Sequence, residues 1–179
     1  MTPRQIRVSK FLAKYLRHEP EALGLTLMPG GWVSLASVIE GARQNGFPLT
    51  MEEIKECVDA NDKKRFSLDG TATLIRANQG HSTPVDLQLT EKQPPRFLFH
   101  GTVGRFTPTI KEKGLDKMRR HHVHLSPDQA TAHKVALRRG RPVILRVRAA
   151  DMHDAGYKFY QSANGVWLTD HVPALYIEW

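Results

Sequence analysis

The spacing of apolar residues changes along this chain, and that change constrains the fold more than any other feature. From Val8 onward, apolar side chains return every three or four positions, as in amphipathic helices. Beyond residue 95, short runs rich in β-branched and aromatic residues take over. Residues 79–95 show neither pattern and contain three prolines. The sequence therefore predicts an α+β protein with domains at 1–78 and 96–179, joined by a linker at 79–95.

The first half of the chain predicts three helices followed by a β-hairpin. Apolar residues form one helical stripe at Val8, Phe11, Leu12, Tyr15 and Leu16. This helix should end at Glu19-Pro20, because the residue before proline avoids helical backbone angles. A second helix is expected from Ser34 to about Asn45, and a third from Thr50, where Glu53 completes a capping box.

The hairpin is expected at residues 65–68 and 71–75, on either side of Asp69-Gly70. Three helices and a hairpin on a basic chain predict a winged-helix module. Winged helices also serve as plain interaction modules, so this fold alone does not give a function.

The second half predicts short strands with few helices. The expected helices begin at Thr107-Pro108, with Gly114 closing the first, and at Ser126-Pro127, with the second running to about Arg139. The expected strands are 97–99 (ending at His100-Gly101-Thr102), 122–125, 143–147, and short pieces near 159, 166–168 and 175–177. A short extended piece is also expected at 85–89, within the linker. Together these elements predict a compact, mainly β, sandwich-like domain.

The net charge favours a polyanionic partner. Lysine and arginine number 26 against 18 acidic residues, giving a formal charge of +8 and a pI near 9.8. Nucleic acid is the first candidate, although a solvated basic surface without a partner has the same composition. Cys57 is the single cysteine, and neither a signal peptide nor a run of 18 apolar residues is present. A cytoplasmic protein with no disulfide and no membrane partner is expected.

Two cationic clusters occur in the first half. Arg17 and His18 stand at the last turn of the first expected helix, and Lys63, Lys64 and Arg65 follow the third. Cations at helix ends commonly only offset the helix dipole. The alternative hypothesis is that Arg17, His18 and Arg65 converge on a phosphate, because guanidinium groups bind phosphate oxygens bidentately.

Histidines are concentrated in the second half, at His100, His121, His122 and His124. A zinc site is not expected, because no carboxylate or cysteine lies nearby at ligand spacing. The chain also lacks the Gly-x-Ser-x-Gly, Gly-x-Gly-x-x-Gly and Walker motifs. Hydrolase, Rossmann and P-loop sites are therefore not expected.

Seven blocks of sequence resemble the RNA 2′-phosphotransferase family, in the same order and over residues 8–177. The blocks are Ser9–Leu12 with Leu16–His18, Gly31–Val33, Asn61–Phe66, Ile75–Ser82, His100–Thr102, His122–Ser126 and Asn164–Thr169. The resemblance implies an N-terminal winged-helix lobe and a C-terminal ADP-ribosyltransferase-like lobe that binds NAD as co-substrate.

The resemblance also implies a reaction and a catalytic tetrad. An internal RNA 2′-phosphate attacks NAD and expels nicotinamide, and the ribose 2″-hydroxyl then attacks the phosphorus. The products are 2′-OH RNA and ADP-ribose 1″,2″-cyclic phosphate, and the substrate is a tRNA-like RNA from splicing or processing. The tetrad corresponds to Arg17, His18, Arg65 and Arg120, with Arg119 as the alternative to Arg120. Whether His18 shuttles a proton or donates a charged hydrogen bond is left open.

The implied NAD-binding residues all lie in the second half. His100 would hold the NAD ribose, and Gly101 would let the backbone approach the nicotinamide amide. His124 and Val166 match the second and third positions of the ADP-ribosyltransferase triad, and Thr102 and Ser126 are further expected contacts. No metal is implied, and a monomer is expected.

Two alternatives from other functional classes remain. One is a winged-helix nucleic-acid-binding protein whose second domain is inactive, which leaves the intact His100-Gly101-Thr102 and arginine tetrad unexplained. The other is an NAD-dependent ADP-ribosyltransferase that modifies nucleic-acid phosphates and stops after the first step. Formation of the cyclic phosphate product distinguishes the two-step reaction from this alternative, because it forms only if both steps run.

Overall fold

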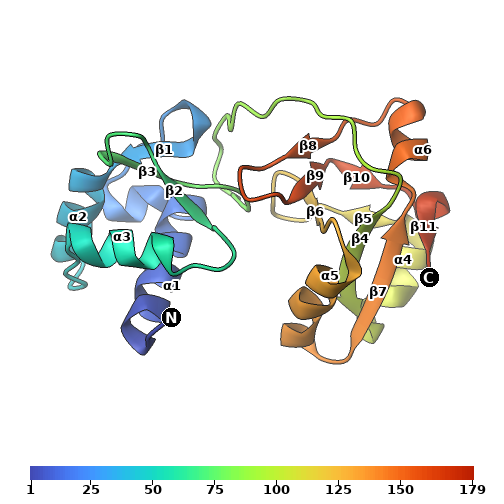
Figure 1. The fold of residues 1–179 in the computed structure, drawn as a ribbon, viewed down its shortest axis with the longest axis horizontal. Helices are drawn as coiled ribbons and strands as arrows, with labels where there is room; N and C mark the ends of the chain where they lie inside the picture. Colours follow the sequence, from blue (N-terminus) through green and yellow to red (C-terminus); the bar gives the residue numbers. More distant parts are fainter. The chain divides into compact units, whose positions relative to one another are not determined.

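The computed structural model describes residues 1–179 and divides into two compact units, Met1–Gln88 and Leu89–Trp179 (Figure 1). The boundary between the units falls inside the segment 79–95 that the sequence predicted as a linker. None of the helices combines the length and the apolar character needed to cross a membrane.

The first unit contains three α-helices, two 3₁₀ turns and one small sheet. Its helices are α1 (Pro3–Arg17), α2 (Leu35–Gln44) and α3 (Met51–Asp59), with 3₁₀ turns at Pro20–Leu23 and Pro29–Gly31. Its strands are β1 (Trp32–Ser34), β2 (Phe66–Leu68) and β3 (Leu74–Ala77).

Side-chain caps set the starts of these helices. Thr50 accepts a hydrogen bond from the Glu53 amide at the start of α3, and the Glu53 carboxylate accepts one from the Thr50 amide. This capping box confirms the predicted start, and Ser34 caps α2 where the second helix was expected. At α1, Thr2 and Gln5 form another capping box, so the helix begins earlier than its apolar stripe indicated.

The sheet of the first unit is antiparallel with strand order β1-β3-β2. The predicted hairpin is present, but the expected tight turn at Asp69-Gly70 is wrong. The loop spans residues 70–73, because the Asp69 carboxylate accepts hydrogen bonds from the amides of Thr71, Thr73 and Leu74. The Thr71 hydroxyl also donates a hydrogen bond to this carboxylate. The hydrogen bonds, of which the hydroxyl bond has the largest effect, lower the pKa of Asp69 to about 2. Strand β1 was not predicted.

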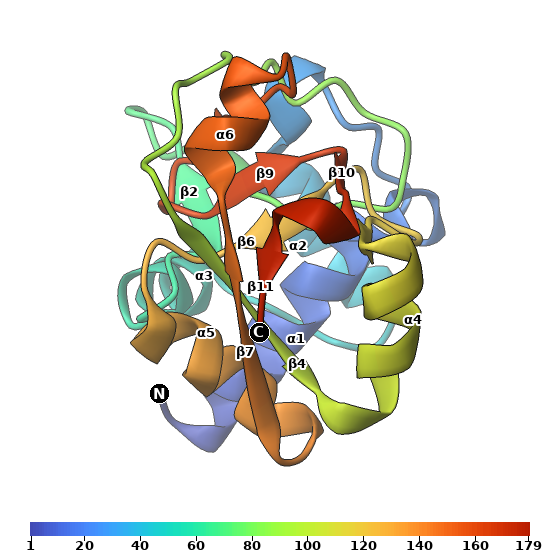
Figure 2. The same cartoon turned by 90° about the vertical axis from the view of Figure 1, so that its right-hand side faces the viewer.

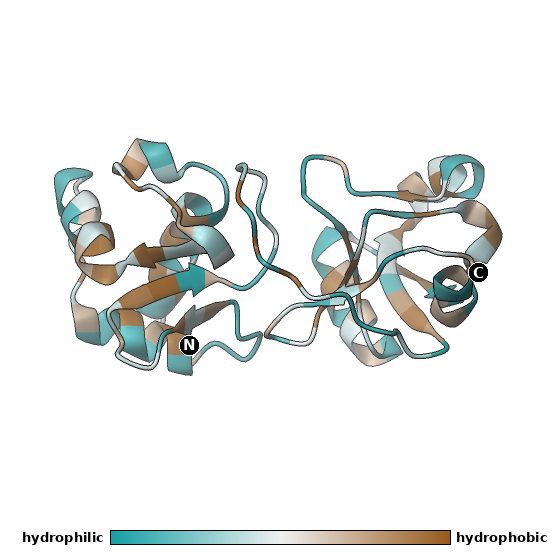
Figure 3. Cartoon of the chain, turned by 90° about the horizontal axis from the view of Figure 1, so that it is seen from above, coloured by the Kyte–Doolittle hydropathy of each residue, from teal (hydrophilic) through white to brown (hydrophobic).

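One apolar core fills the space between the helices and the inner face of this sheet. The residues at its centre are Val8, Leu12, Leu16, Val33, Leu35, Val38, Ile54, Cys57, Phe66, Ile75 and Ala77. In Figure 3 the strands carry much of the apolar colour, while the loops are largely hydrophilic. Burying the α1 stripe stabilises the helix far more than its intrinsic propensity does. The stripe thereby fixes the position of the residues at the end of α1.

The second unit combines short sheets with more helix than predicted. Its helices are α4 (Thr107–Lys113), α5 (Gln129–Ala136) and α6 (Ala149–Asp154), with 3₁₀ turns at Gly104–Phe106, Leu137–Arg139 and Ala174–Tyr176. Its strands are β4 (Leu98–Val103), β5 (Leu115–Asp116), β6 (Val123–Leu125), β7 (Pro142–Val147), β8 (Tyr160–Gln161), β9 (Trp167–Thr169), β10 (His171–Val172) and β11 (Ile177–Glu178).

The strands of this unit form three antiparallel sheets, β11-β7-β4, β6-β9-β8 and β10-β5. The longest pairing joins β4 to β7 over six residues, from Leu98↔Val147 to Val103↔Pro142. In Figure 2, α5 lies on one side of this pair and α4 on the other. The helix α4 ends at Gly114 as predicted.

Three predictions for the second unit need correction. Strand β4 continues through His100-Gly101-Thr102 instead of ending there. The helix α5 is capped by Asp128, not by Ser126-Pro127, because the Asp128 carboxylate accepts a 2.7 Å hydrogen bond from the Thr131 amide. This α-helix stops at Ala136, and a 3₁₀ turn continues to Arg139.

The segment 79–95 packs against the units it was predicted only to connect. In the first unit, Gly30 donates a 2.7 Å amide hydrogen bond to the Asp86 carbonyl. In the second unit, Lys92 donates one of 2.8 Å to the Phe159 carbonyl, and Glu91 forms a bridge with Tyr160. No strand forms at residues 85–89.

Candidate active site

Arg17 and His18 end the first helix, where the chain must leave the helical path before Pro20. His18 is the C-cap of α1. The Arg17 carbonyl accepts hydrogen bonds from the amides of Ser82, at 2.9 Å, and Thr83, at 3.2 Å. The His18 Nδ1 atom lies 2.8 Å from the Ser82 hydroxyl oxygen. A segment distant in sequence therefore caps this helix end and orients the imidazole.

Arg65 precedes β2 and is fixed at both its backbone and its side chain. Its carbonyl accepts a 2.9 Å hydrogen bond from the Asn78 amide. Its Nη1 donates a 3.0 Å bond to the Asn61 Oδ1 atom. Asn61 is only 1% exposed, and its amide nitrogen lies 3.3 Å from the Ser9 hydroxyl. The guanidinium is therefore held by a buried, hydrogen-bonded partner.

The segment 78–83 links these two positions. Asn78 binds the backbone of Arg65, and Ser82 binds the backbone of Arg17, so both arginines are anchored to one short stretch of chain. Between them, Gly80 adopts a φ of 89°, and a side chain added there would lie 3.7 Å from the Arg17 Nη1 atom. The Arg17 guanidinium carbon lies 5.8 Å from the centre of the Phe66 ring, in the residue that follows Arg65. Arg17, His18 and Arg65 thus lie in one region of the first unit.

His100 in the second unit is a neutral hydrogen-bond acceptor. Its Nδ1 atom lies 3.0 Å from the His124 carbonyl oxygen, which can only accept, so Nδ1 carries the proton. Burial lowers the pKa of His100, and the charges of Arg139 and Arg120 lower it further, against the opposing effect of the His124 carbonyl. The Nε2 atom therefore presents a lone pair at neutral pH, suited to a hydroxyl donor.

Gly101 and Thr102 follow His100 on β4 and are both buried. A Cβ atom at Gly101 would lie 2.0 Å from the Ala132 carbonyl oxygen, well inside van der Waals contact. Glycine is thus needed for α5 to pack against β4, a reason that the sequence did not suggest. Thr102 is 3% exposed, so its side chain lies within the fold.

His124, Ser126 and Val166 gather where β4, β6 and β9 meet. Ser126 exchanges backbone hydrogen bonds of 2.7 and 2.9 Å with Phe99, next to His100. His124 pairs with Leu168 across β6 and β9. Val166 immediately precedes β9, and its amide lies 3.1 Å from the Ser162 hydroxyl. The structure therefore brings four predicted NAD-binding residues to one junction: His100, His124, Ser126 and Val166.

Arg120 differs from Arg119 in its electrostatic surroundings. Desolvation of the guanidinium lowers the pKa of Arg120, and the charge of Arg139 lowers it further. Both Arg120 and Arg139 act on His100. Arg119 is not among the charges that lower the pKa of His100. These surroundings favour Arg120 over Arg119 as the residue near His100.

One of the clustered histidines of the second unit, His122, contacts an aromatic ring. The His122 ring meets the Tyr160 ring edge-on, with 5.5 Å between the ring centres. No group of three histidine, cysteine, aspartate or glutamate side chains is arranged to hold a metal ion.

Several residues of this region carried no role in the sequence analysis. Asn61, Asn78 and Ser82 position the predicted cations, and Arg139 adds a charge near His100. Asn61, Asn78 and Ser82 stand inside the blocks that resemble the family, which was the available signal. Arg139 belongs to a basic stretch at residues 138–141, for which the sequence predicted no role.

Comparison with known proteins identifies one family. A family model described as "RNA 2′-phosphotransferase, Tpt1 / KptA family" matches residues 3–171. A protein of Nostoc punctiforme named "Probable RNA 2′-phosphotransferase" is 53% identical over 175 residues, covering 98% of this chain and 97% of its own length. Proteins of the same name from Streptomyces coelicolor and Burkholderia pseudomallei are 53% and 51% identical, over 97% and 96% of this chain and 94% of each relative.

Proposed function

The chain belongs to the RNA 2′-phosphotransferase family, and on that premise we propose that it removes an internal RNA 2′-phosphate by transferring it to NAD. The observation that carries the proposal is the shared anchoring of Arg17 and Arg65 to residues 78–83. Two guanidinium groups and the His18 imidazole, held in one region, provide the donors that a phosphate dianion requires.

The first unit would bind the 2′-phosphate. Arg65 has one guanidinium nitrogen bonded to Asn61, which fixes the direction of the group. His18, oriented by Ser82, would either donate a charged hydrogen bond or move a proton. We propose Arg120 of the second unit as the fourth tetrad member, as the resemblance implies.

The second unit would bind NAD. The neutral His100 can accept a hydrogen bond from a ribose hydroxyl at Nε2, while its Nδ1–H stays bonded to the His124 carbonyl. His124, Ser126 and Val166 would complete the pocket. Thr102 and Gly101 are implied by the resemblance, although Thr102 is buried and Gly101 packs against α5. A cationic imidazole could not accept such a bond, so the lowered pKa of His100 supports this role.

The proposed reaction has two steps. A 2′-phosphate oxygen attacks the anomeric carbon of the nicotinamide ribose, and the bond to the nicotinamide nitrogen breaks. The ribose 2″-hydroxyl then attacks the phosphorus, the bond to the RNA 2′-oxygen breaks, and the proton of the 2″-hydroxyl ends on that oxygen. Fixed guanidinium donors stabilise the charge that gathers on the phosphate oxygens in both steps.

We extend the proposal to fold and partner. Three helices with an antiparallel β-hairpin support a winged-helix assignment for the first unit, and the β4–β7 pair with its flanking helices supports an ADP-ribosyltransferase-like second unit. The net charge of +8 fits an RNA substrate, which we take to be tRNA-like. We expect the protein to act as a monomer.

The test uses a synthetic RNA with one internal 2′-phosphate, incubated with and without NAD. The expected products are 2′-OH RNA, nicotinamide and ADP-ribose 1″,2″-cyclic phosphate in equal amounts, and only when NAD is present. An RNA that ends as a stable ADP-ribosylated phosphate would instead support the transferase that stops after the first step. Unchanged RNA in the presence of NAD would refute the proposal.

A further inference from the structure

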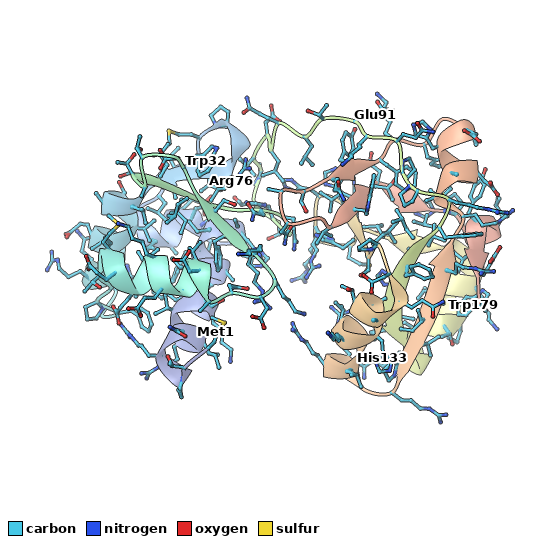
Figure 4. All side chains as sticks on the ribbon, in the orientation of Figure 1. Met1, Trp32, Arg76, Glu91, His133 and Trp179 are labelled. Carbon is cyan, nitrogen blue, oxygen red and sulfur yellow. The ribbon has the colours of Figure 1, made fainter.

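A tryptophan and an arginine face each other on the sheet of the first unit. Trp32 on β1 and Arg76 on β3 are cross-strand partners, and the Arg76 guanidinium carbon lies 4.6 Å from the centre of the indole ring. Figure 4 labels both side chains, which lie side by side. Both are partly exposed, whereas the neighbouring Val33, Ile75 and Ala77 are buried in the core. The pair therefore stands on the outer face of the sheet.

Arg76 has hydrogen-bonding capacity that the fold does not use. Its Nε atom is buried and has no hydrogen-bond partner, and no carboxylate lies within ion-pair distance of its guanidinium. A charged guanidinium without a counter-ion, stacked on an aromatic ring, costs desolvation that the Trp32 contact only partly offsets. Such a pair is suited to a flat anionic or π-rich ligand.

Arg65 lies at one end of this sheet, directly before β2. Side chains alternate along a strand, so Ser67 faces outward while Phe66 faces the core. The Arg65 side chain turns toward Asn61, on the side of the helices. Ser67 pairs with Arg76, and Arg76 pairs with Trp32, which places the three side chains in one row across the sheet. From strand spacing and rise, Trp32 and Arg65 lie about 12 Å apart between Cα atoms.

We infer that the Trp32–Arg76 pair binds a nucleobase of the RNA strand that carries the 2′-phosphate. This inference rests on the proposed function, since it takes Arg65 as a phosphate ligand. With the phosphate at Arg65, the base at Trp32 belongs to a neighbouring nucleotide or to the next one along the strand. The indole offers a stacking surface, and Arg76 adds a donor and a cation.

The chemistry of the face favours RNA over a protein partner. The partly exposed residues beside Trp32 on this face are Ser67 and Arg76, and none of the three strands carries an acidic residue. Stacking of a base on an aromatic side chain accepts any base, because every base has a π-face. The pair should therefore improve RNA binding with little preference for sequence.

The first experiment leaves the protein unchanged. Steady-state kinetics with saturating NAD are measured on RNAs that carry one 2′-phosphate and an abasic residue at each flanking position in turn. Loss of the stacked base should raise KM by roughly fivefold to 100-fold at one or two positions, with kcat nearly constant. Equal KM values at every abasic position would overturn the inference.

Variants then assign the effect to the pair. Trp32→Leu and Arg76→Gln should raise KM for intact RNA by the same factor and should be insensitive to the abasic position. Trp32→Phe should keep most of the binding, because it retains an aromatic ring. Arg7→Ala, which removes an exposed cation from α1, is the charge-matched control and should not change the abasic pattern.

Folding and function are separated by two further readouts. Thermal melting of each variant shows whether Trp32 and Arg76 only stabilise the sheet: a lower Tm with unchanged KM for RNA would assign them a structural role and overturn the inference. A failure of wild-type enzyme to convert any RNA with NAD would refute the proposed function instead. Normal conversion with no flanking-base effect would refute only this inference.

Discussion

The two units differ in the charge of the polar side chains that they hold in place. The first holds cations in place: Arg65 by Asn61, and the backbones of Arg17 and Arg65 by residues 78–83. The second keeps an imidazole neutral, by burial and by the nearby charges of Arg139 and Arg120. Under the proposed function, the first unit would recognise a doubly charged phosphate by charge, and the second an uncharged ribose hydroxyl by hydrogen bonding. We therefore expect the two units to respond differently to substitution, pH and salt.

The largest effect is expected from the arginines. Arg65→Ala or Arg120→Ala should lower the rate by about 10²-fold or more, as loss of a fixed transition-state donor does, with little change in Tm. Arg→Lys should recover little activity, because an ammonium group cannot bind two phosphate oxygens in the same plane. Single-turnover rates and thermal melts provide the measurement. Full activity of both lysine variants would show that bidentate contact is not needed.

The comparison becomes sharper when the two steps are separated. The second step gathers more charge on the phosphate, so Arg17→Ala, His18→Ala or Arg65→Ala should slow it at least about tenfold more than the first. ADP-ribosylated RNA should then accumulate. His100→Ala should instead leave unreacted RNA, because it weakens use of NAD. A gel time course with NAD resolves the species, and absence of the intermediate from all three first-unit variants would refute this division.

The pH dependence tests the neutral state of His100. Because its pKa lies below the ordinary value of about 6.5, KM for NAD should stay constant as pH falls through 6.5. It should increase by up to about tenfold per pH unit only below the lowered pKa, where protonation removes the Nε2 acceptor. Arg139→Ala should raise this pKa and move the increase to higher pH. An increase that begins above pH 6.5 in the wild type would contradict the assignment.

The smallest effect is expected at the Ser82 side chain, which contacts the site through His18. Ser82→Ala removes the 2.8 Å contact to Nδ1 and should lower the rate roughly two- to tenfold. Ser37→Ala, which removes an exposed hydroxyl from α2 of the first unit, is the matched control. A loss at Ser82 as large as that at Arg65 would mean that the orientation of His18 matters as much as phosphate charge.

Local features of the fold could be predicted from the sequence, and distant pairings could not. The capping box at Thr50 and Glu53 lies within one helical turn, so the residues themselves specify it. Strand β1 has three residues and exists only because Trp32–Ser34 pair with a strand some forty residues later. At α5, Ser126 and Asp128 were both plausible caps, and only the structure shows which side chain reaches the Thr131 amide.

The candidate site shows the same limit. Arginine and histidine at a helix end indicated a phosphate site because their chemistry is specific. The role of residues 78–83 could not be predicted, because it consists of backbone hydrogen bonds to the carbonyls of Arg17 and Arg65, which leave no trace in side-chain type. Asn61 acts through a single side-chain bond to Arg65. These residues lie in blocks that resemble the family, but the resemblance did not indicate which interactions they make.

The attachment of residues 78–83 also decides where the chain can be divided. His81 is fully buried and Thr83 is 7% exposed, although both lie beyond the predicted end of the first domain at residue 78. A fragment that stopped there would leave the end of α1 uncovered and the Arg17 carbonyl without its two amide donors. A fragment that ran to Gln88, where the compact unit ends, would retain both. Anyone who produces the first unit alone should therefore include residues 79–88, ten residues that the sequence predicted as part of a linker.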